Sequence, residues 1–509
     1  MNESEIVRVF RDNRMLITPS ALEELRGKES KDIIEVIDKL KDLYKNYGGS
    51  EEAVIRTVTE TDIKEATQTI KIPTFVEIKR ATDFKPLAKE YGHDFKIHTE
   101  YDITGKSRCK GEISDFVQYF NERFKKIKNV LLSRPSTNRV VNIETLSKLK
   151  PGENARVICM ITSKTMTKKG HMIVEVEDDT GGTTILVLKE NDQKKPHEKS
   201  CFEKAQLLVN DEVVAIDVRT STNFKIANDI TWPDLPIKPK KTIEKDLAVA
   251  FISDVHVGSK YFCDAEFERM INWLRGVGPG KELAEKVGYL LVAGDVVDGI
   301  GIYPKQEKDL VLKDVYEQYK LFSRFLEMIP DHIEIIVAPG NHDAVRLAEP
   351  QPAIPSDMIN AEGRVHSVGN PAYVDIEGLH TLLYHGGSLE AVIAALPGMD
   401  TLHPEAAAME LLKRRTLNPL YDMNDIAPEH QDYLFIEGDI DIFHTGHWHR
   451  NAYSEYRGTV VLNSGCWISQ TDYQLKRGIV PTPAILPVYE MKSGHIRHMT
   501  FNSPEIKIV

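Results

Sequence analysis

LAVAFISDVH, residues 247–256, is the stretch on which the fold assignment depends. Its first six residues are apolar, which is typical of a strand buried on both faces of a sheet. The apolar run ends at Ser253, and Asp254 and His256 follow two positions apart. On an extended backbone, residues two positions apart point to the same side. We therefore expect Asp254 and His256 to face one ligand together.

Further buried strands follow this one, with helical patterns between them. The expected strands cover residues 247–252, 289–293, 333–338, 381–384, 440–444 and 460–462. Between the first two strands, Phe267, Met270, Ile271 and Leu274 keep the spacing of one helix face. Strands that alternate with helices indicate an α/β domain, which we place at residues 245–509.

Five of these strands end in polar clusters. After Asp254 and His256 come Gly294-Asp295, Gly340-Asn341-His342-Asp343, His385-Gly386 and Gly446-His447-Trp448-His449. Ligands of α/β sheets gather outside the carboxyl ends of the strands. A single histidine after a strand is more often a structural residue, but five such clusters in this order are hard to reach by chance. The sequence therefore predicts one shared site at this edge of the sheet.

The half of the chain that precedes this domain divides into three parts. We expect a small helical domain at residues 1–48, a linker at residues 49–135 and a β-domain at residues 136–236. Alternating runs at 157–161, 172–176, 185–188 and 213–218, with turn clusters between them, predict about five short strands and an OB-like barrel. Such barrels commonly bind oligonucleotides, and a protein-binding platform remains an equal alternative.

The composition is that of an ordinary globular protein. The 509 residues are 41% hydrophobic and 28% charged, and a chain of this length holds about three domains. Neither an apolar run of about 18 residues nor a signal-peptide core is present, so we expect a cytoplasmic protein without a membrane span. The five cysteines are widely spaced, which predicts reduced thiols.

The series D-x-H, G-D, G-N-H-D, H-G and G-H-x-H over residues 250–470 resembles the calcineurin-like metallophosphoesterases. The resemblance implies two metal ions that share Asp295. It assigns Asp254, His256, Asp295 and His449 to one ion, and Asp295, Asn341, His385 and His447 to the other. A ligand set without thiolates suits Mn²⁺, with Fe, Zn and Mg as rivals.

Two metal ions roughly 3.5–4 Å apart can lower the pKa of a bridging water and stabilise the charge that develops at a phosphodiester. The family pattern leaves His342 unligated, and we expect it to donate the proton to the leaving alkoxide. Asp343 is expected to orient His342. Asp298 is expected to be structural and to bond to its own loop.

A closer resemblance links nearly the whole chain, except the divergent residues 49–135, to the small subunits of archaeal family D DNA polymerases. It is carried by GDVVDGIGIYP (294–304), APGNHDAVRLAEPQP (338–352), AAAMELLKRRTLNPLY (406–421) and HTGHWHRNAY (444–453). That family implies a 3′→5′ DNA exonuclease for proofreading, with DNA and a large catalytic subunit as partners and a sliding clamp as a further candidate. Related eukaryotic subunits have lost metal ligands and act as scaffolds, but here every ligand position is filled.

Charge is distributed unevenly, with +2 over residues 1–250 and −14 over residues 251–509. An acidic domain that handles DNA needs basic residues beside its site. Arg346 and the run Lys413, Arg414 and Arg415 are the expected DNA contacts. The alternative for the run is a helix C-terminus whose cations complement the helix dipole. Residues 101–150, with 11 Lys and Arg against 5 Asp and Glu, could also face a polyanion or be a solvated surface.

Overall fold

The computed structural model describes residues 3–13, 15–28, 30–46, 56–58, 63, 83–189, 199–502 and 506–508. The chain divides into two compact units, residues 1–76 and residues 77–509. Among the described residues, no helix is long and apolar enough to cross a membrane. All five cysteines are free, and Cys159, Cys201 and Cys466 are buried.

The first unit contains three helices and a two-stranded parallel sheet within its described residues. These are α1 (Glu3–Asp12), β1 (Met15–Ile17), α2 (Pro19–Glu24), α3 (Ser30–Asn46) and β2 (Arg56–Val58). Thr18 caps α2 by accepting a hydrogen bond from the backbone amide of Ala21 at 3.3 Å, and Pro19 suits the first helical position because it has no amide hydrogen to leave unpaired. Ile6, Phe10, Leu25, Ile37 and Leu40 are buried in its core. The expected domain end at residue 48 lies outside the described residues.

Residues 154–231 of the larger unit contain a five-stranded barrel. Its strands are β5 (Asn154–Met166), β6 (Met172–Asp178), β7 (Gly181–Val187), β8 (Val213–Thr220) and β9 (Lys225–Thr231). The spatial order is β5-β6-β7-β9-β8, and pairing of β8 with β5 closes the barrel. The alternating apolar residues point inward, among them Val157, Val174, Ile185, Ile216 and Ile230. Short helices α7 (Ile143–Leu146) and α8 (Cys201–Gln206) and strand β4 (Val140–Val141) accompany it.

Two sheets form the centre of the C-terminal domain. The first has the order β13 (Val365–Ser367), β12 (Glu334–Ala338), β11 (Val287–Ala293), β10 (Ala248–Ile252), β19 (Ile485–Glu490), β20 (His495–Thr500) and β21 (Lys507–Ile508). Strands β10 to β13 are parallel, as the expected alternation of strands and helices requires. The second has the order β17 (Asn451–Tyr456), β18 (Thr459–Ser464), β16 (Ile442–Thr445), β15 (Leu379–Tyr384), β14 (Ala372–Ile376) and β3 (Phe95–Ile97).

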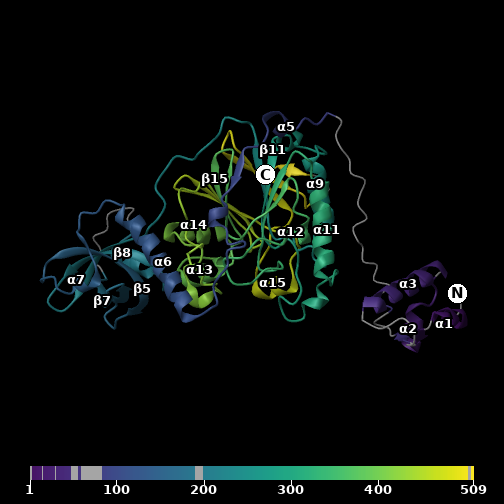
Figure 1. Cartoon of the computed structure of the whole chain (residues 1–509), viewed down its shortest axis with the longest axis horizontal. Helices are drawn as coiled ribbons and strands as arrows, with labels where there is room; N and C mark the ends of the chain where they lie inside the picture. The colour runs from purple at the N-terminus through teal and green to yellow at the C-terminus, as the bar shows by residue number, and fades with distance from the viewer. Residues whose placement is uncertain are drawn as a thin grey trace. The chain divides into compact units, whose positions relative to one another are not determined.

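Helices cover both outer faces of this pair of sheets (Figure 1). Helices α9 (Asp264–Leu274) and α11 (Val315–Met328) pack on the first sheet, and α13 (Leu389–Ala395) and α14 (Pro404–Arg414) pack on the second. Phe251, Leu291, Leu383 and Val460 fill the core between the sheets. The result is a four-layer α/β/β/α domain. Its shorter helical segments are α10 (Lys281–Ala284), η2 (Gln306–Lys308), α12 (Ser356–Ile359), η3 (Tyr421–Met423) and α15 (Asp472–Arg477).

The expectation that residues 49–135 are a linker is wrong for residues 83–135. Strand β3 pairs with β14 and so becomes the edge of the second sheet. Helix α6 (Ile113–Leu132) buries Ile127 and Leu131 against barrel residues and Phe435. The segment also contains α5 (Ala88–Tyr91) and η1 (Thr99–Tyr101). Strand β3 and the helical segments α5 and η1 span only three or four residues each, which is too short for a periodic pattern to show in the sequence.

The basic surplus of residues 101–150 is partly used inside the protein. Arg123 is 1% exposed and pairs with Asp432 at 3.2 Å. Lys126 pairs with Glu437 at 2.8 Å, and Arg134 donates to backbone carbonyls at Pro233 and Asp234. These cations therefore connect α6 and the chain after it to neighbouring elements and do not form one solvated basic face.

Candidate metal centre

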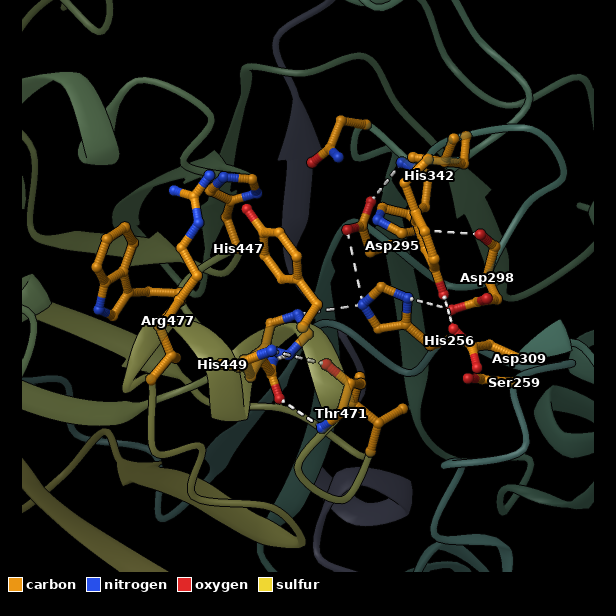
Figure 2. A pocket seen from close by; sticks show the side chains of 18 of the residues that line it. His256, Ser259, Asp295, Asp298, Asp309, His342, His447, His449, Thr471 and Arg477 are labelled. Atoms are coloured by element: carbon orange, nitrogen blue, oxygen red, sulfur yellow. Dashed lines mark hydrogen bonds and ion pairs between the residues drawn. The ribbon is translucent and has the colours of Figure 1, made fainter. Parts of the chain in front are cut away.

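The seven candidate ligands come together where the carboxyl ends of both sheets meet. Asp254 and His256 follow β10, Asp295 follows β11 and Asn341 follows β12 in the first sheet. The second sheet supplies the others, with His385 directly after β15 and His447 and His449 after β16. Figure 2 shows His447 and His449 on one side of the site and His256, Asp295 and His342 on the other.

The backbone of the site is held in a conformation that residues with a Cβ atom rarely adopt. Five of the seven candidate ligands have a positive φ, namely Asp254 (51°), His256 (52°), Asp295 (52°), His447 (67°) and His449 (57°). The expectation that an extended backbone places Asp254 and His256 on one side is therefore wrong in its reason, although the two side chains do lie together. Left-handed backbone at non-glycine residues costs free energy and gathers at functional sites.

Two glycines of the predicted motifs are required by close approach to the ligands. A Cβ atom on Gly294 would lie 2.6 Å from Nδ1 of His385. A Cβ atom on Gly446 would lie 2.7 Å from Oδ2 of Asp254. Both separations are shorter than van der Waals contact, so a side chain at either position would displace a candidate ligand.

One cluster of candidate ligands is formed by Asp254, His256 and His449. Nε2 of His449 lies 3.3 Å from Oδ1 of Asp254 and 3.2 Å from Nε2 of His256. Nε2 of His256 also lies 3.7 Å from Oδ2 of Asp295. The side chain of Asp295 is therefore within reach of this cluster.

A second cluster is formed by Asp295, His385 and His447. Nε2 of His385 lies 3.4 Å from Oδ2 of Asp295, 3.2 Å from Nδ1 of His447 and 2.9 Å from Oδ1 of Asn341. The same carboxylate oxygen of Asp295 thus approaches a histidine of each cluster. This is the position that a bridging ligand occupies between two ions.

The chemistry of the donors fits cations. Oδ1 of Asp254 is buried and has no hydrogen-bond partner within the described part of the chain. Nδ1 of His385 bonds to the carbonyl oxygen of Ala293 at 2.8 Å, which leaves Nε2 as the ring nitrogen that faces Asn341 and can face a metal ion.

The electrostatics of the site favour positive charge in the same place. Burial alone lowers the pKa of His385, but Asp295 and Asp254 raise it to about 10. Burial raises the pKa of Asp295, but His385 and His342 outweigh this and hold it well below its usual range. Burial and the neighbouring His385 lower the pKa of His447 to about 4, and a neutral imidazole is the form that binds metals.

Two residues that the sequence analysis did not assign to ligand positioning support the histidines from behind. Oδ1 of Asp298 lies 3.1 Å from Nδ1 of His256, and Nε2 of Gln474 lies 2.7 Å from Nδ1 of His449. Asp298 also accepts from Gln306 of its own loop at 3.1 Å. Asp298 therefore does more than the expected bonding within its loop, because a carboxylate on one ring nitrogen fixes which nitrogen faces a metal. Thr471-x-x-Gln474 signals a helix start in the sequence, but not this contact.

The predicted pairing of His342 with Asp343 is replaced by another arrangement. Nδ1 of His342 bonds to the backbone carbonyl of Asp298 at 2.8 Å, and its amide donates to Oδ1 of Asp295 at 2.8 Å. The Asp343 carboxylate instead accepts from the amide of Gly340 at 2.8 Å and from the hydroxyl of Tyr319 at 3.1 Å. Burial and the charge of Asp295 raise the pKa of Asp343 to about 7. Asp343 thus holds the turn that carries His342, whereas the Asp298 carbonyl orients the ring.

The predicted DNA contacts Lys413, Arg414 and Arg415 are wrong, because all three are used between α14 and the barrel or its neighbouring loops. Arg414 is 2% exposed, and its guanidinium pairs with the barrel residue Glu212 at 2.9 Å. Lys413 lies 4.0 Å from the ring centre of Trp232. Nε of Arg415 donates to the carbonyl of Asp234 at 3.2 Å.

Arg346 is likewise occupied by the protein itself. Its guanidinium pairs with the buried Glu429 at 2.8 Å, and its Nε donates to the carbonyl of Pro350 at 2.8 Å. Glu429 in turn accepts hydrogen bonds from Ser107 and from the amide of Arg108. Arg346 therefore holds the segment around residue 107 against the loop after β12.

A cavity of about 310 Å³ opens onto the candidate ligands. Its wall includes Asp295, Asn341, His342, His447 and His449. Other lining residues come from α15 and the segment around it, among them Thr471, Tyr473, Gln474, Arg477 and Ile479. The two clusters and His342 therefore share one space that a substrate can enter.

Comparisons with known proteins agree with this arrangement. The family model described as calcineurin-like phosphoesterase matches residues 247–454. The DNA polymerase II small subunit of Methanocaldococcus jannaschii is 40% identical over 425 residues, covering 81% of this chain and 70% of that protein. The protein of the same name from Archaeoglobus fulgidus is 40% identical over 401 residues, with 78% and 79% covered. The one from Methanothermobacter thermautotrophicus is 36% identical over 496 residues, with 95% and 97% covered. The chain therefore belongs to the archaeal DNA polymerase II small subunits and carries a calcineurin-like phosphoesterase domain.

Proposed function

We propose that this chain is the proofreading subunit of a DNA polymerase and carries a two-metal 3′→5′ DNA exonuclease, while a large subunit performs synthesis. The observation that carries the proposal is the carboxylate of Asp295, one oxygen of which lies 3.7 Å from His256 and 3.4 Å from His385. A carboxylate shared by two histidine clusters suits a pair of ions, and paired ions are used to hydrolyse phosphodiesters. Membership of a polymerase small-subunit family makes DNA the fitting substrate.

The calcineurin-like phosphoesterase domain implies divalent metal ions, and the donors of this chain fit them. We assign one ion to Asp254, His256, Asp295 and His449, and the other to Asp295, Asn341, His385 and His447. Imidazole, carboxylate and amide donors without thiolates favour Mn²⁺ over the rivals Fe, Zn and Mg. When bound, the ions supply a nucleophilic hydroxide and stabilise the charge of the reacting phosphate.

His342 is the proposed proton donor to the leaving 3′ oxygen of the shortened strand. Its Nδ1 is committed to the carbonyl of Asp298, so Nε2 is the atom that exchanges the proton with the substrate. The bond from its amide to Asp295 keeps the ring beside the shared carboxylate. Asp343 acts on this residue only through the turn that both belong to.

The barrel is proposed to bind DNA as an OB-like domain at residues 136–236. Numbered along the chain, its strands have the order 1-2-3-5-4 with closure between 1 and 4, which suits a five-stranded OB barrel. We further propose that single-stranded 3′ ends and primer–template junctions, the large subunit and a sliding clamp are the partners of the whole chain. A helical domain at residues 1–48 and a catalytic domain at residues 245–509 complete the proposed organisation.

A 5′-labelled primer with a mismatched 3′ end, annealed to its template, tests the proposal directly. The full chain, alone and together with its large subunit, is incubated with Mn²⁺ or with EDTA, and the products are separated by length. We expect stepwise shortening from the 3′ end in Mn²⁺ and none in EDTA. Asp295→Ala is the matched control and should abolish shortening, because loss of a shared carboxylate weakens both ion sites.

Three results would contradict the proposal. If Asp295→Ala shortens the primer nearly as fast as the wild type does, the assignment of the metal site is wrong. Shortening from the 5′ end, or internal cuts alone, would show a different nuclease. If neither the chain nor the complex hydrolyses DNA with Mn²⁺, or when the assay is repeated with Fe, Zn or Mg, the subunit is a scaffold.

A further inference from the structure

Helix α15 places one aromatic ring and one cation at the mouth of the catalytic cavity. Arg477 is the single Lys or Arg among the described residues that line the cavity. Tyr473 lines the same cavity and is 57% exposed. The domain is strongly acidic, and the predicted DNA contacts Arg346, Lys413, Arg414 and Arg415 are held by ion pairs, a ring contact or backbone carbonyls of the protein itself. Arg477 is therefore the cation best placed to meet a phosphate near the candidate ligands.

The helix is attached to the metal centre by its own inward-facing residue. Thr471 and Gln474 form a reciprocal cap at the start of α15, and Gln474 is 6% exposed with its amide 2.7 Å from Nδ1 of His449. Tyr473 and Arg477 are four positions apart and therefore share the neighbouring face of the helix. Their side chains are in contact, with the guanidinium carbon 5.1 Å from the ring centre. The ring and the cation are thus positioned by the same short element that supports a candidate ligand.

The present partner of Arg477 is one that a phosphate can replace. Arg477 lies 3.5 Å from Glu390 at the start of α13, and the two side chains are 56% and 63% exposed. Glu390 also lines the cavity, so the ion pair crosses its rim. An exposed ion pair of this kind contributes little free energy, whereas guanidinium groups bind phosphate strongly through paired hydrogen bonds.

We propose that Tyr473 and Arg477 form a binding subsite for the terminal nucleotide of a single DNA strand, with Tyr473 stacking on the base and Arg477 binding the adjacent phosphate. This inference rests on the exonuclease function proposed above. The cavity of about 310 Å³ is at the lower end of ligand pockets, which begin at roughly 300 Å³, and so suits one nucleotide. To enter a cavity that holds one nucleotide, the terminal base must first leave its base pair, which costs least at a mismatched or already single-stranded end. The subsite is therefore selective for frayed or mismatched 3′ ends.

Binding is measured by fluorescence anisotropy with the full chain and a 5′-fluorescein oligonucleotide whose terminal linkages are phosphorothioates. Two modified strands are compared with the normal strand. One has an abasic 3′-terminal residue, and the other has a methylphosphonate at the last linkage. Tyr473→Ala should bind the normal strand about tenfold more weakly, within the range for loss of one base stack. It should also lose the preference for the normal over the abasic strand. Tyr473→Phe keeps the ring and should retain both properties.

Arg477→Ala should weaken binding and reduce the slope of log affinity against log salt by about 0.7, the value for one phosphate contact with a single strand. It should no longer distinguish the methylphosphonate strand. Glu390→Gln should act in the opposite direction and bind more tightly, because it releases Arg477. Leu475→Ala and Lys476→Ala are the matched controls, since both residues are exposed on α15 outside the cavity. Both controls should bind as the wild type does.

The subsite is refuted if Tyr473→Ala still discriminates against the abasic strand, or if Lys476→Ala lowers the salt slope as much as Arg477→Ala. It is also refuted if both cavity variants bind like the wild type while the wild type degrades DNA. If instead the wild type never hydrolyses DNA but the variants and modified strands behave as expected, the subsite stands and the exonuclease proposal falls. The two proposals therefore fail in distinguishable ways.

Discussion

Replacement of Arg414 by alanine should break the contact between the barrel and α14 and lower the free energy of unfolding. It should not change the affinity for DNA. The side chain of Arg414 is 1% exposed, and so is that of its partner Glu212, 2.9 Å away. Arg414 also pairs with Glu410 and donates to the carbonyl of Leu207 at 2.7 Å. The alanine variant keeps both glutamates but removes the cation that they surround.

The expected loss is about 3–5 kcal/mol of unfolding free energy, the usual effect of breaking a buried ion pair by removing one partner. Glu212 dominates this cost because it stays buried in the variant, where, among the described residues, its carboxylate keeps hydrogen bonds from the indole of Trp232 and the amide of Val209 alone. Burial already raises the pKa of Glu212 despite the opposing charge of Arg414. Without Arg414 the carboxyl group should take up a proton, so the loss should shrink as the pH is lowered.

Urea unfolding followed by tryptophan fluorescence is a suitable assay, since Trp232 lies in this contact. Arg414→Met combined with Glu212→Gln is the matched control, because it removes both charges and keeps an acceptor for Trp232. The double variant should lose less than the two single variants together, by about 1–3 kcal/mol. A wild-type unfolding midpoint for Arg414→Ala, together with weaker DNA binding and a flatter salt dependence, would refute the buried position of this residue.

Three further predictions concern the site and the segment beside it. Asp298→Asn should weaken Mn²⁺ binding about 10- to 100-fold by calorimetry, as loss of a carboxylate behind a metal-binding histidine does, and unchanged affinity would contradict its role behind His256. His342→Ala should lose about 10²–10⁴ in the rate of hydrolysis with full metal content by elemental analysis, whereas loss of metal would make His342 a ligand. Burial raises the pKa of Glu429, but bonds from Ser107, Arg108 and Arg346 lower it from 4.5 to about 2. A carboxyl group whose pKa is lowered in the folded state stabilises the fold above pH 4.5, and this stabilisation is lost as the pH falls toward 2. The free energy of unfolding that Glu429 contributes should therefore change by about 3 kcal/mol over this range. Urea midpoints measured across this pH range should converge for the wild type and Glu429→Gln, and parallel curves would show that Glu429 is not perturbed.

Much of the catalytic domain could be predicted because its information is local. Strands β10 and β11 are apolar throughout and β12 is apolar after its first residue, Glu334; all three are buried in a parallel sheet, and their bounds agree with the expected ones to within two residues. The polar clusters follow these runs directly, so a parallel sheet must bring them to one edge. The membership of the calcineurin-like phosphoesterases that these clusters indicated was confirmed by the family match.

Other features depend on partners that are far away in the sequence. Strand β3 has only three residues, and it is a strand because β14, nearly 280 positions later, offers a free edge. The arginine of α14 that looked like a DNA contact bonds to Leu207, 207 positions away. A run of basic residues shows charge, but burial and partners decide whether that charge binds DNA or joins two parts of the protein.

The sequence by itself determined strands β10, β11 and β12 of the first sheet and the residue types at each strand end, since apolar runs, turns and ligand motifs are read over a few neighbouring positions. Only the tertiary structure decided that Asp298, and not Asp343, orients His342, that Gln474 supports His449, and that Arg477 is the cation left at the cavity. Those assignments depend on side-chain direction and burial, which are set when separate segments pack against one another, here 44 residues apart for Asp298 and His342 and 25 residues apart for His449 and Gln474. These contacts cannot be read from the order of residues along the chain, because each depends on how all the groups in the same buried space pack together.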